Sequence, residues 1–259
     1  MQYRYETHLH TCSASACGIA RGRDYIPYYQ DRGYAGLIVT DHFFGGNTAV
    51  DQRLPWTEQV NRFCEGYEEA KNEGDKRGFQ VLFGWEQAYS GDEYLIYGLD
   101  KAWLLAHPEV KHWSRAEQFE QVQRYGGCVV QAHPFRDRAY IRRIHLNTVC
   151  VHGVEVYNAA NPLTVNVQAY RYAKRLGLPM LAGSDIHELP ASELSGVFFT
   201  QALADEQDLA ARIRNRAPIG LIAPTDALAS AELQPVRLPV EVLGAQARAI
   251  DTPLADLFT

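Results

Sequence analysis

The sequence predicts an α/β barrel, because short strand-like runs alternate with helix-like stretches from Tyr3 to about Thr200. Such alternation favours parallel strands over an antiparallel fold. The length of 259 residues is typical of a single α/β barrel, although two smaller domains stay open. Histidines and carboxylates also follow several of the strand-like runs. Such barrels carry their chemistry at the carboxyl ends of the strands.

Eight runs rich in apolar and β-branched residues predict strands, and seven or eight strands are the number expected for a barrel. The runs are 2–7, 35–40, 79–83, 94–99, 127–131, 153–157, 179–181 and 196–200. Five longer stretches predict the intervening helices, and a glycine follows four of them, as expected for a left-handed C-terminal cap. These helices are 24–32, 56–77, 114–125, 163–176 and 205–214, and the glycines are Gly33, Gly78, Gly126 and Gly177.

The predicted domain organisation is one barrel over residues 1–217 and a short C-terminal extension over residues 218–259. Within the extension, residues 219–223 and 236–242 each predict a short strand. No second set of chemically reactive residues occurs there, so a second catalytic domain is not expected. The extension is expected to pack on the barrel or on a partner subunit, which leaves a homo-oligomer open.

The composition, with 46% hydrophobic and 22% charged residues, is that of an ordinary globular protein. A net charge of −6 offers no cationic track for nucleic acid, so a nucleic-acid partner is not expected. No apolar stretch approaches the roughly 18 residues of a spanning helix, and the first residues lack the apolar segment of a signal peptide. We therefore expect a cytoplasmic protein with no membrane partner. Five cysteines without a Cys-x-x-Cys pair predict reduced thiols.

Histidines and carboxylates at the ends of the strand-like runs predict a metal site. Residues i and i+2 of an extended segment point to the same side, so His8 and His10 can hold one ion together, as can Asp185 and His187. Imidazole suits zinc, manganese or iron, and a carboxylate such as Glu86 can bridge two ions. A purely structural role would have to supply other partners for every one of these groups. The candidates are His8, His10, Asp41, His42, Glu86, His133, Asp185 and His187.

Six short motifs occur in a defined order between residues 3 and 200. They are His8-Leu9-His10-Thr11, Thr40-Asp41-His42, Gly84-Trp85-Glu86, Ala132-His133-Pro134, Glu155-Val156-Tyr157-Asn158 and Gly183-Ser184-Asp185-Ile186-His187. This ordered set resembles the PHP (polymerase and histidinol phosphatase) family. The resemblance implies a distorted seven-stranded (βα) TIM-like barrel, two or three divalent metal ions (Zn, Mn or Fe), and hydrolysis of phosphoesters.

The resemblance also implies which residues hold each ion. By position, His8, His10, Glu86 and Asp185 would hold the first ion, Glu86 and His133 the second, and His42 and His187 the third.

The chain departs from the family pattern at two places. Cys17 stands where the family often has an acidic residue or a histidine. It is either a thiolate ligand, which favours zinc or iron, or a thiol that leaves the third site weak or empty. Many relatives also carry a histidine near the fourth strand, which this chain lacks, and Asp100 or Tyr94 could substitute for it.

The expected reaction is hydrolysis of a small phosphorylated metabolite or nucleotide by a metal-activated water. Glu86 and Asp185 are the predicted catalytic residues; Asp185 is primarily a ligand and could also accept the proton of the water. Phosphate requires a cation with fork geometry, and Arg136 is the first choice. Asn158 and Arg21 are further candidates for substrate binding, with turn and surface roles as their alternatives.

Two other classes of function stay open. An amidohydrolase-type enzyme shares the His-x-His motif but usually bridges its metals with a lysine, and here only Lys101 follows a strand-like run closely. A non-catalytic PHP-like module is the third class, and the intact ligand pairs argue against it.

Overall fold

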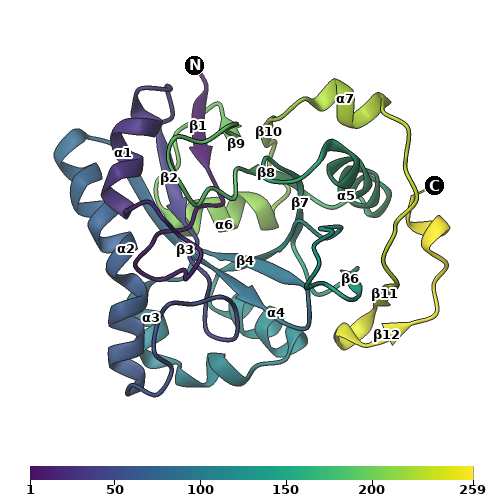
Figure 1. Cartoon of the computed structure of the whole chain (residues 1–259), viewed down its shortest axis with the longest axis horizontal. Coiled ribbons are helices and arrows are strands. Elements are labelled where there is room, and N and C mark those ends of the chain that lie inside the picture. Colours follow the sequence, from purple (N-terminus) through teal and green to yellow (C-terminus); the bar gives the residue numbers. More distant parts are fainter. Residues whose placement is uncertain (259) are drawn as a thin grey trace.

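The structure is a computed structural model that describes residues 1–258 of the chain. Its main sheet consists of nine strands: β1 (Tyr3–Glu6), β2 (Gly36–Val39), β3 (Gln80–Ala88), β4 (Glu93–Tyr97), β5 (Cys128–Ala132), β7 (Gly153–Asn158), β8 (Met180–Gly183), β9 (Gly196–Phe199) and β10 (Gly220–Ile222). Their order in the sheet is β10-β9-β1-β2-β3-β4-β5-β7-β8. Helices cover the outside of this sheet (Figure 1).

The sheet curls into a nearly closed barrel. Its two flanks are parallel, with β1, β2 and β3 on one side and β5, β7 and β8 on the other. The flanks meet just beyond β1 and β8, where Leu9 pairs in parallel with Ile186. There the His10 amide donates to the Ile186 carbonyl oxygen at 2.9 Å, and the Ile186 amide donates to the His8 carbonyl oxygen at 3.3 Å. We call this pairing the seam.

The α/β barrel-like fold predicted from the sequence is confirmed, but a seven-stranded count is not, because the sheet has nine strands. The expectation of parallel strands is wrong at β4, which is antiparallel to both β3 and β5, and at β9, which is antiparallel to β1. Residues 89–92 join β3 to β4 in a tight turn, in which the Tyr89 amide donates to the Asp92 carbonyl oxygen at 2.9 Å. A parallel pair needs a crossover of a dozen or more residues. The start of β4 therefore lies beside the end of β3.

The five predicted helices form close to their expected bounds, and two short helices were not predicted. The helices are α1 (Gly22–Gln30), α2 (Trp56–Arg77), α3 (Lys101–Ala106), α4 (Arg115–Arg124), α5 (Leu163–Leu176), α6 (Glu206–Arg214) and α7 (Thr225–Ser230), with 3-10 turns at Pro108–His112, Ala245–Ala247 and Leu254–Leu257. The predicted caps are confirmed, since Gly33, Gly78, Gly126 and Gly177 all have positive φ. No helix within residues 1–258 combines the length and the apolar character needed to cross a bilayer.

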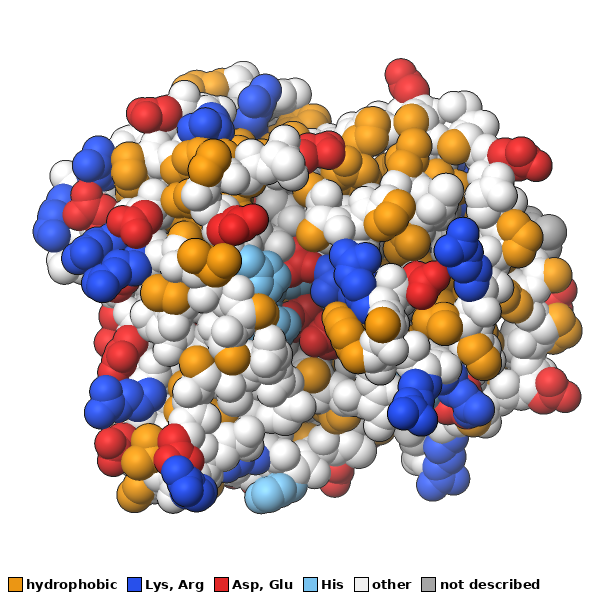
Figure 2. Space-filling model, in the orientation of Figure 1, with side chains coloured by type: hydrophobic (Ala, Val, Ile, Leu, Met, Phe, Trp, Pro, Cys, Tyr) orange, Lys and Arg blue, Asp and Glu red, His pale blue; other side chains and the backbone are white. Residues whose placement is uncertain are grey.

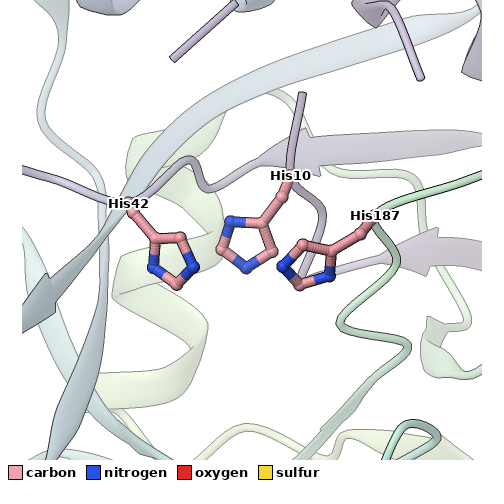
Figure 3. A group of neighbouring side chains, drawn as sticks. All are labelled: His10, His42 and His187. Atoms are coloured by element: carbon pink, nitrogen blue, oxygen red, sulfur yellow. The ribbon is translucent and has the colours of Figure 1, made fainter. Parts of the chain in front are cut away.

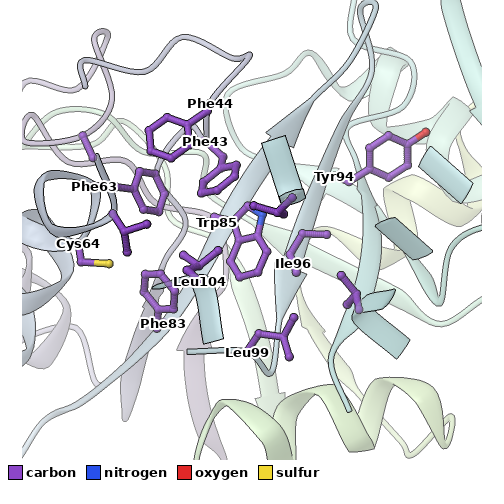
Figure 4. Packing of buried hydrophobic residues seen from close by; sticks show 14 of the residues in the cluster. Phe43, Phe44, Phe63, Cys64, Phe83, Trp85, Tyr94, Ile96, Leu99 and Leu104 are labelled. Carbon is purple, nitrogen blue, oxygen red and sulfur yellow. The ribbon is translucent and has the colours of Figure 1, made fainter. Parts of the chain in front are cut away.

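An aromatic cluster fills the layer between the barrel and helices α2 and α3 (Figure 4). Trp85 on β3 is fully buried there, with its ring centroid 5.6 Å from that of Phe43. Phe43 in turn meets Phe63 of α2 edge-to-face at 5.1 Å. Because side chains alternate along a strand, a Trp85 that faces the helices turns Glu86 to the opposite face of β3.

The C-terminal residues lie along the side of the barrel that carries α5 (Figure 1). β10 extends the main sheet beside β9, and β11 (Val240–Leu243) forms a separate small sheet with β6 (Ile144–Asn147) and β12 (Ala249–Ile250). The parallel pairing of β11 with β6 matters for the site, since β6 follows directly on the loop that leaves β5.

Candidate metal centre

Seven of the predicted side chains meet at the carboxyl end of the barrel. All but His187 are buried, and they come from segments far apart in the sequence: Glu86 lies within β3, and the others follow strands or flank the seam. Their potential ligand atoms form compact groups of three, with all atoms of a group within 4.8 Å of one another. The groups are His8 with Glu86 and His133, His8 with His10 and Asp185, His10 with His42 and His187, and His42 with Glu86 and Glu93.

Glu86 occupies the centre of this arrangement. Its Oε1 lies 3.1 Å from His133 Nε2 and 3.3 Å from His8 Nε2, and its Oε2 lies 2.8 Å from His42 Nδ1. The sequence places Glu86 after a strand, but it lies within β3, whose pairing with β4 continues to Ala88. A carboxylate with both oxygens facing imidazoles has the geometry of a bridge between two ions.

The second part of the arrangement is built from residues that flank the seam. The imidazole of His10 stacks between those of His42 and His187, at centroid distances of 4.2 and 4.3 Å (Figure 3). Asp185 Oδ1 lies 3.2 Å from His10 Nε2 and 3.5 Å from His8 Nε2. Extended backbone at residues 8–10 puts both imidazoles on the inner side, with Leu9 buried on the other.

Two of these residues sit in unusual backbone conformations. His133 has φ +24° and Asp185 has φ +54°. Left-handed conformations are uncommon outside glycine and concentrate at functional sites. At both positions the strand has just ended, and the turn directs the side chain over the mouth of the barrel.

Glu155 on β7 orients two of the imidazole-bearing residues. Its Oε1 lies 2.9 Å from His8 Nδ1, and its Oε2 accepts hydrogen bonds from the His133 amide and from Asn158 Nδ2, both at 3.0 Å. A carboxylate on one ring nitrogen fixes the tautomer that presents the other nitrogen to a metal. The sequence contained this residue within a motif, but gave no role to it.

Glu6 is a second buried carboxylate, and it forms hydrogen bonds with both segments that lead into the seam. It accepts hydrogen bonds from the amides of His8 at 2.8 Å and Ser184 at 2.9 Å, and from the Tyr29 hydroxyl at 2.6 Å. Burial raises its pKa, although these hydrogen bonds act against that shift. Glu6 thereby ties the end of β1 to the end of β8.

Asp41, the carboxylate next to His42, lies outside the compact ligand groups of the described chain. Its carboxylate accepts hydrogen bonds from the Thr11 amide and the Ser15 hydroxyl, both at 2.6 Å. The Ser15 oxygen in turn lies 3.1 Å from His10 Nδ1. Alternation along the strand explains the outcome, because neighbours Asp41 and His42 point to opposite sides. Asp41 fixes the loop after His10 instead of holding an ion.

Asp100 and Tyr94, the two alternatives near the fourth strand, have hydrogen-bond partners elsewhere, and Glu93 is the residue of this strand that joins a compact ligand group. Asp100 caps α3 by accepting from the Trp103 amide at 2.7 Å. The Tyr94 hydroxyl donates to Asp92 at 2.6 Å. Because β4 is antiparallel, its first residue is the one at the mouth, and Glu93 Oε2 lies 3.6 Å from His133 Nε2. The short turn after β3 was the signal that could have located Glu93.

The donor set fits divalent cations. Within the described chain, three buried atoms at the centre of the site make no hydrogen bond, namely His42 Nδ1, Glu86 Oε2 and Asp185 Oδ1. His42 Nδ1 and Glu86 Oε2 are close enough for a hydrogen bond but lack its angular geometry. Leaving such atoms unpaired is costly, whereas bound cations would satisfy all three.

The ionisation of the site points the same way. Burial lowers the pKa of His8, but the carboxylates of Glu155 and Glu86 outweigh it and raise the pKa to about 10. Burial and the charge of Glu86 raise the pKa of Glu93. The pKa of Glu86 is held well below its usual range by His8 and His42, against the effect of burial. The buried carboxylates thus favour positive charge in the site. Without metal ions, protonated histidines supply that charge.

Cys17 lies beside the third group of ligands. Burial raises the pKa of its thiol, but hydrogen bonds with His187 and His42 outweigh this and lower the pKa to about 6. The thiol does not belong to the compact set of His10, His42 and His187. This lowered pKa favours the thiolate, which is the form of cysteine that binds soft metals.

The predicted substrate-binding residues take different places. The Arg136 guanidinium is buried and pairs with Asp185 Oδ2, and its Nε makes no hydrogen bond among the described residues. Asn158 Nδ2 donates to the same Asp185 oxygen at 3.2 Å. Arg21 is exposed and precedes α1. A cleft of about 490 Å³ opens beside these groups, with Cys17, Ile19, Ala160, Asp185, His187 and Glu193 among its lining residues.

Comparisons with known proteins agree with this fold. A family model described as PHP-associated matches residues 164–218, from α5 past the end of α6. No curated protein matches the sequence. A two-domain protein from Bacteroides vulgatus, containing a predicted PHP-like metal-dependent phosphoesterase, has a TM-score of 0.59 at 14% identity over 83% of this chain and 63% of that chain. This chain thus spans less than two thirds of that protein.

Two further solved structures are similar over nearly their whole length. A proposed metal-dependent phosphoesterase from Bifidobacterium adolescentis has a TM-score of 0.53 at 17% identity, over 83% of this chain and 96% of that chain. An amidohydrolase from Chromobacterium violaceum, solved with bound sulfate and no metal, has a TM-score of 0.51 at 16% identity, over 86% and 99%. At these identities the likeness shows a shared fold. The family model covers residues 164–218 alone, and the likeness to these structures is a likeness of fold.

Proposed function

We propose that the protein is a metal-dependent phosphoesterase that hydrolyses a small phosphorylated molecule. The observation that carries this proposal is the set of overlapping ligand groups around Glu86, whose buried central atoms have no hydrogen-bond partner in the described chain. A buried arginine beside the same group supplies the cation that a phosphate requires.

We propose that two or three divalent ions (Zn, Mn or Fe) occupy these groups. Glu86 and Asp185 would hold them together with the histidines that flank the seam, and Cys17 is a further candidate ligand beside the group of His10, His42 and His187. Bound ions of this kind supply a water of lowered pKa and neutralise charge on phosphoryl oxygens. Glu93 adds an oxygen donor beside His42 and His133, where relatives carry a histidine.

The chain's own residues position the phosphoryl group. Arg136 is held by its pair with Asp185, and its Nε is buried without a hydrogen-bond partner in the described chain. Its guanidinium is the positive charge that lies beside the ligand groups. Asn158 holds the same carboxylate oxygen from the other side. With Oδ2 engaged by both, Asp185 keeps Oδ1 directed toward His8 and His10.

The amidohydrolase alternative lacks its usual lysine. Lys101 is on α3, where its ammonium pairs with Glu68 at 2.5 Å on the outer surface. The Chromobacterium amidohydrolase is similar in fold, and that likeness is compatible with either chemistry. The bridging position in this chain belongs to Glu86.

The test combines metal analysis with hydrolysis. Purified protein should carry two or three equivalents of Zn, Mn or Fe, and should release phosphate from an aryl phosphate. His8→Ala and Glu86→Ala should each lose metal and activity, whereas His107→Ala, which removes a histidine stacked on Trp103 at 4.2 Å, should lose neither. Full metal retention and full activity in both site variants would refute the assignment. Turnover of amide substrates without phosphoester turnover would instead favour the amidohydrolase reaction.

A further inference from the structure

The loop that leaves β5 is strongly cationic, although the protein as a whole is acidic. Residues 136–143 read Arg-Asp-Arg-Ala-Tyr-Ile-Arg-Arg, and the chain has a net charge of −6. The loop starts three residues after His133, where the Arg136 amide donates to the His133 carbonyl oxygen at 2.9 Å. Figure 2 shows basic side chains directly beside the hollow in which histidine and acidic side chains gather. The positive charge of this loop thus begins at Arg136, close to the candidate ligand His133.

The four arginines of this loop differ in how their charge is compensated. Arg136 pairs with Asp185, and Arg143 pairs with Glu241 of β11 at 2.8 Å. Arg138 donates instead to the backbone oxygen of Ala160 at 2.9 Å and more weakly to the Asn161 amide oxygen at 3.4 Å. These neutral acceptors fix the guanidinium but do not cancel its charge. A guanidinium has five donors, so Arg138 keeps donors for a ligand.

The contacts of Arg138 place it next to the substrate cleft. Ala160, its main acceptor, lines the cleft together with Asp185 and His187. The Ala160 amide donates to Asn158 Oδ1 at 3.1 Å, and Asn158 donates to Asp185 at 3.2 Å. A short hydrogen-bonded chain thus links the Arg138 guanidinium to the carboxylate that faces the seam histidines.

We propose that Arg138 is a specificity-determining residue that binds a second anionic group of the substrate. Arg136 contacts the phosphate that is hydrolysed, and Arg138 contacts a phosphate or carboxylate elsewhere on the same molecule. Ile19, which is 68% exposed and lines the cleft, offers an apolar surface to the organic part between the two anions. The inference rests on the proposed phosphoesterase function and narrows its substrate class to doubly anionic phosphoesters.

Binding measurements on zinc-loaded protein test this directly. Calorimetry compares glycerol 3-phosphate with 3-phosphoglycerate, which adds a carboxylate, and fructose 6-phosphate with fructose 1,6-bisphosphate, which adds a phosphate. The unaltered protein should bind at least one doubly anionic member about tenfold or more tightly than its partner, as expected for a charge-assisted bidentate contact. R138Q should abolish that preference, and R138K should keep part of it because the charge remains without the fork.

The matched control is R142Q, since Arg142 is exposed on the same loop. R142Q should keep the full preference. A melting temperature of R138Q within about two degrees of the unaltered protein shows that its loop is retained; if it falls further, the R138K result decides. The inference is overturned if no doubly anionic compound binds more tightly, or if R138Q weakens both members of a pair equally. Hydrolysis of 4-nitrophenyl phosphate, measured in parallel, reports separately on the proposed function.

Discussion

Replacement of Glu155 by glutamine is the perturbation that best tests how the metal centre is organised. Glu155 touches no predicted ion, yet its two oxygens hold the His8 ring at 2.9 Å and the His133 amide at 3.0 Å. Glutamine keeps the shape of the side chain but removes its charge and replaces one acceptor with a donor. His8 Nδ1 then loses the carboxylate that fixes the tautomer of the ring. The orientation of Nε2 toward Glu86 is no longer enforced.

The expected magnitude follows from these contacts. Removal of a carboxylate that orients a metal-binding histidine typically costs 10–100-fold in metal affinity, or about 1.4–2.7 kcal/mol. Glu155 supports a histidine shared by two of the ligand groups, so we expect a loss near the upper end. Burial and the His8 charge act in opposite directions on the pKa of Glu155, which ends below its usual range. The carboxylate is therefore ionised when it holds His8.

Competition with a chromophoric zinc chelator measures the affinity, and circular dichroism of the metal-free protein checks the fold. Glu193→Gln is the matched control, because that exposed carboxylate lies by the same cleft and accepts from the Tyr157 hydroxyl, without touching a histidine. The reasoning fails if Glu155→Gln folds normally and binds zinc as tightly as the Glu193→Gln control.

Three further outcomes follow. Glu93→Ala should reduce the bound metal measured by mass spectrometry. Asp100→Ala should leave the bound metal unchanged and lower the free energy of unfolding by about 1 kcal/mol, because a helix cap is lost. The reverse pattern would show that Asp100, and not Glu93, belongs to the metal site. The pKa of His8 is raised to about 10 from 6.5, so its protonation stabilises the metal-free protein below pH 6.5 and this contribution is lost as the pH approaches 10. Metal must displace that proton, so zinc affinity should rise steadily between pH 7 and 9, and a flat profile would contradict the shift. Gly66→Ala would place a methyl carbon 2.0 Å from the Thr11 hydroxyl oxygen, so thermal denaturation should show a lower melting temperature, and an unchanged value would show that the loop yields freely.

Much of the fold and of the ligand set could be predicted from the sequence because both depend on local patterns. The spacing in His8-Leu9-His10 fixes two imidazoles on one side of an extended segment, whatever the rest of the chain does. Helix bounds followed from periodicity and from glycine caps such as Gly78. These signals are read from a few consecutive residues.

The errors arose where strand direction decides which end of a segment matters. Asp100 was suggested because it follows β4, on the assumption that β4 is parallel to its neighbours. The turn at residues 89–92 reverses the strand and brings Glu93 to the mouth instead. Asp41 turns away from the ligand groups although His42 joins them, because adjacent residues of an extended segment cannot both face the interior. The roles of Glu155 and Arg138 depend on partners far away in the sequence, which no local pattern reveals.

The seam gives the metal centre an unusual dependence on alignment. Leu9 and Ile186 pair directly, and each is flanked on both sides by candidate ligands. Because successive side chains point to opposite faces, sliding one segment by a single residue would exchange ligands for an aliphatic side chain and empty half of the cluster. Metal coordination therefore requires the correct register between the two segments. Bound ions would stabilise the barrel only when Leu9 pairs with Ile186.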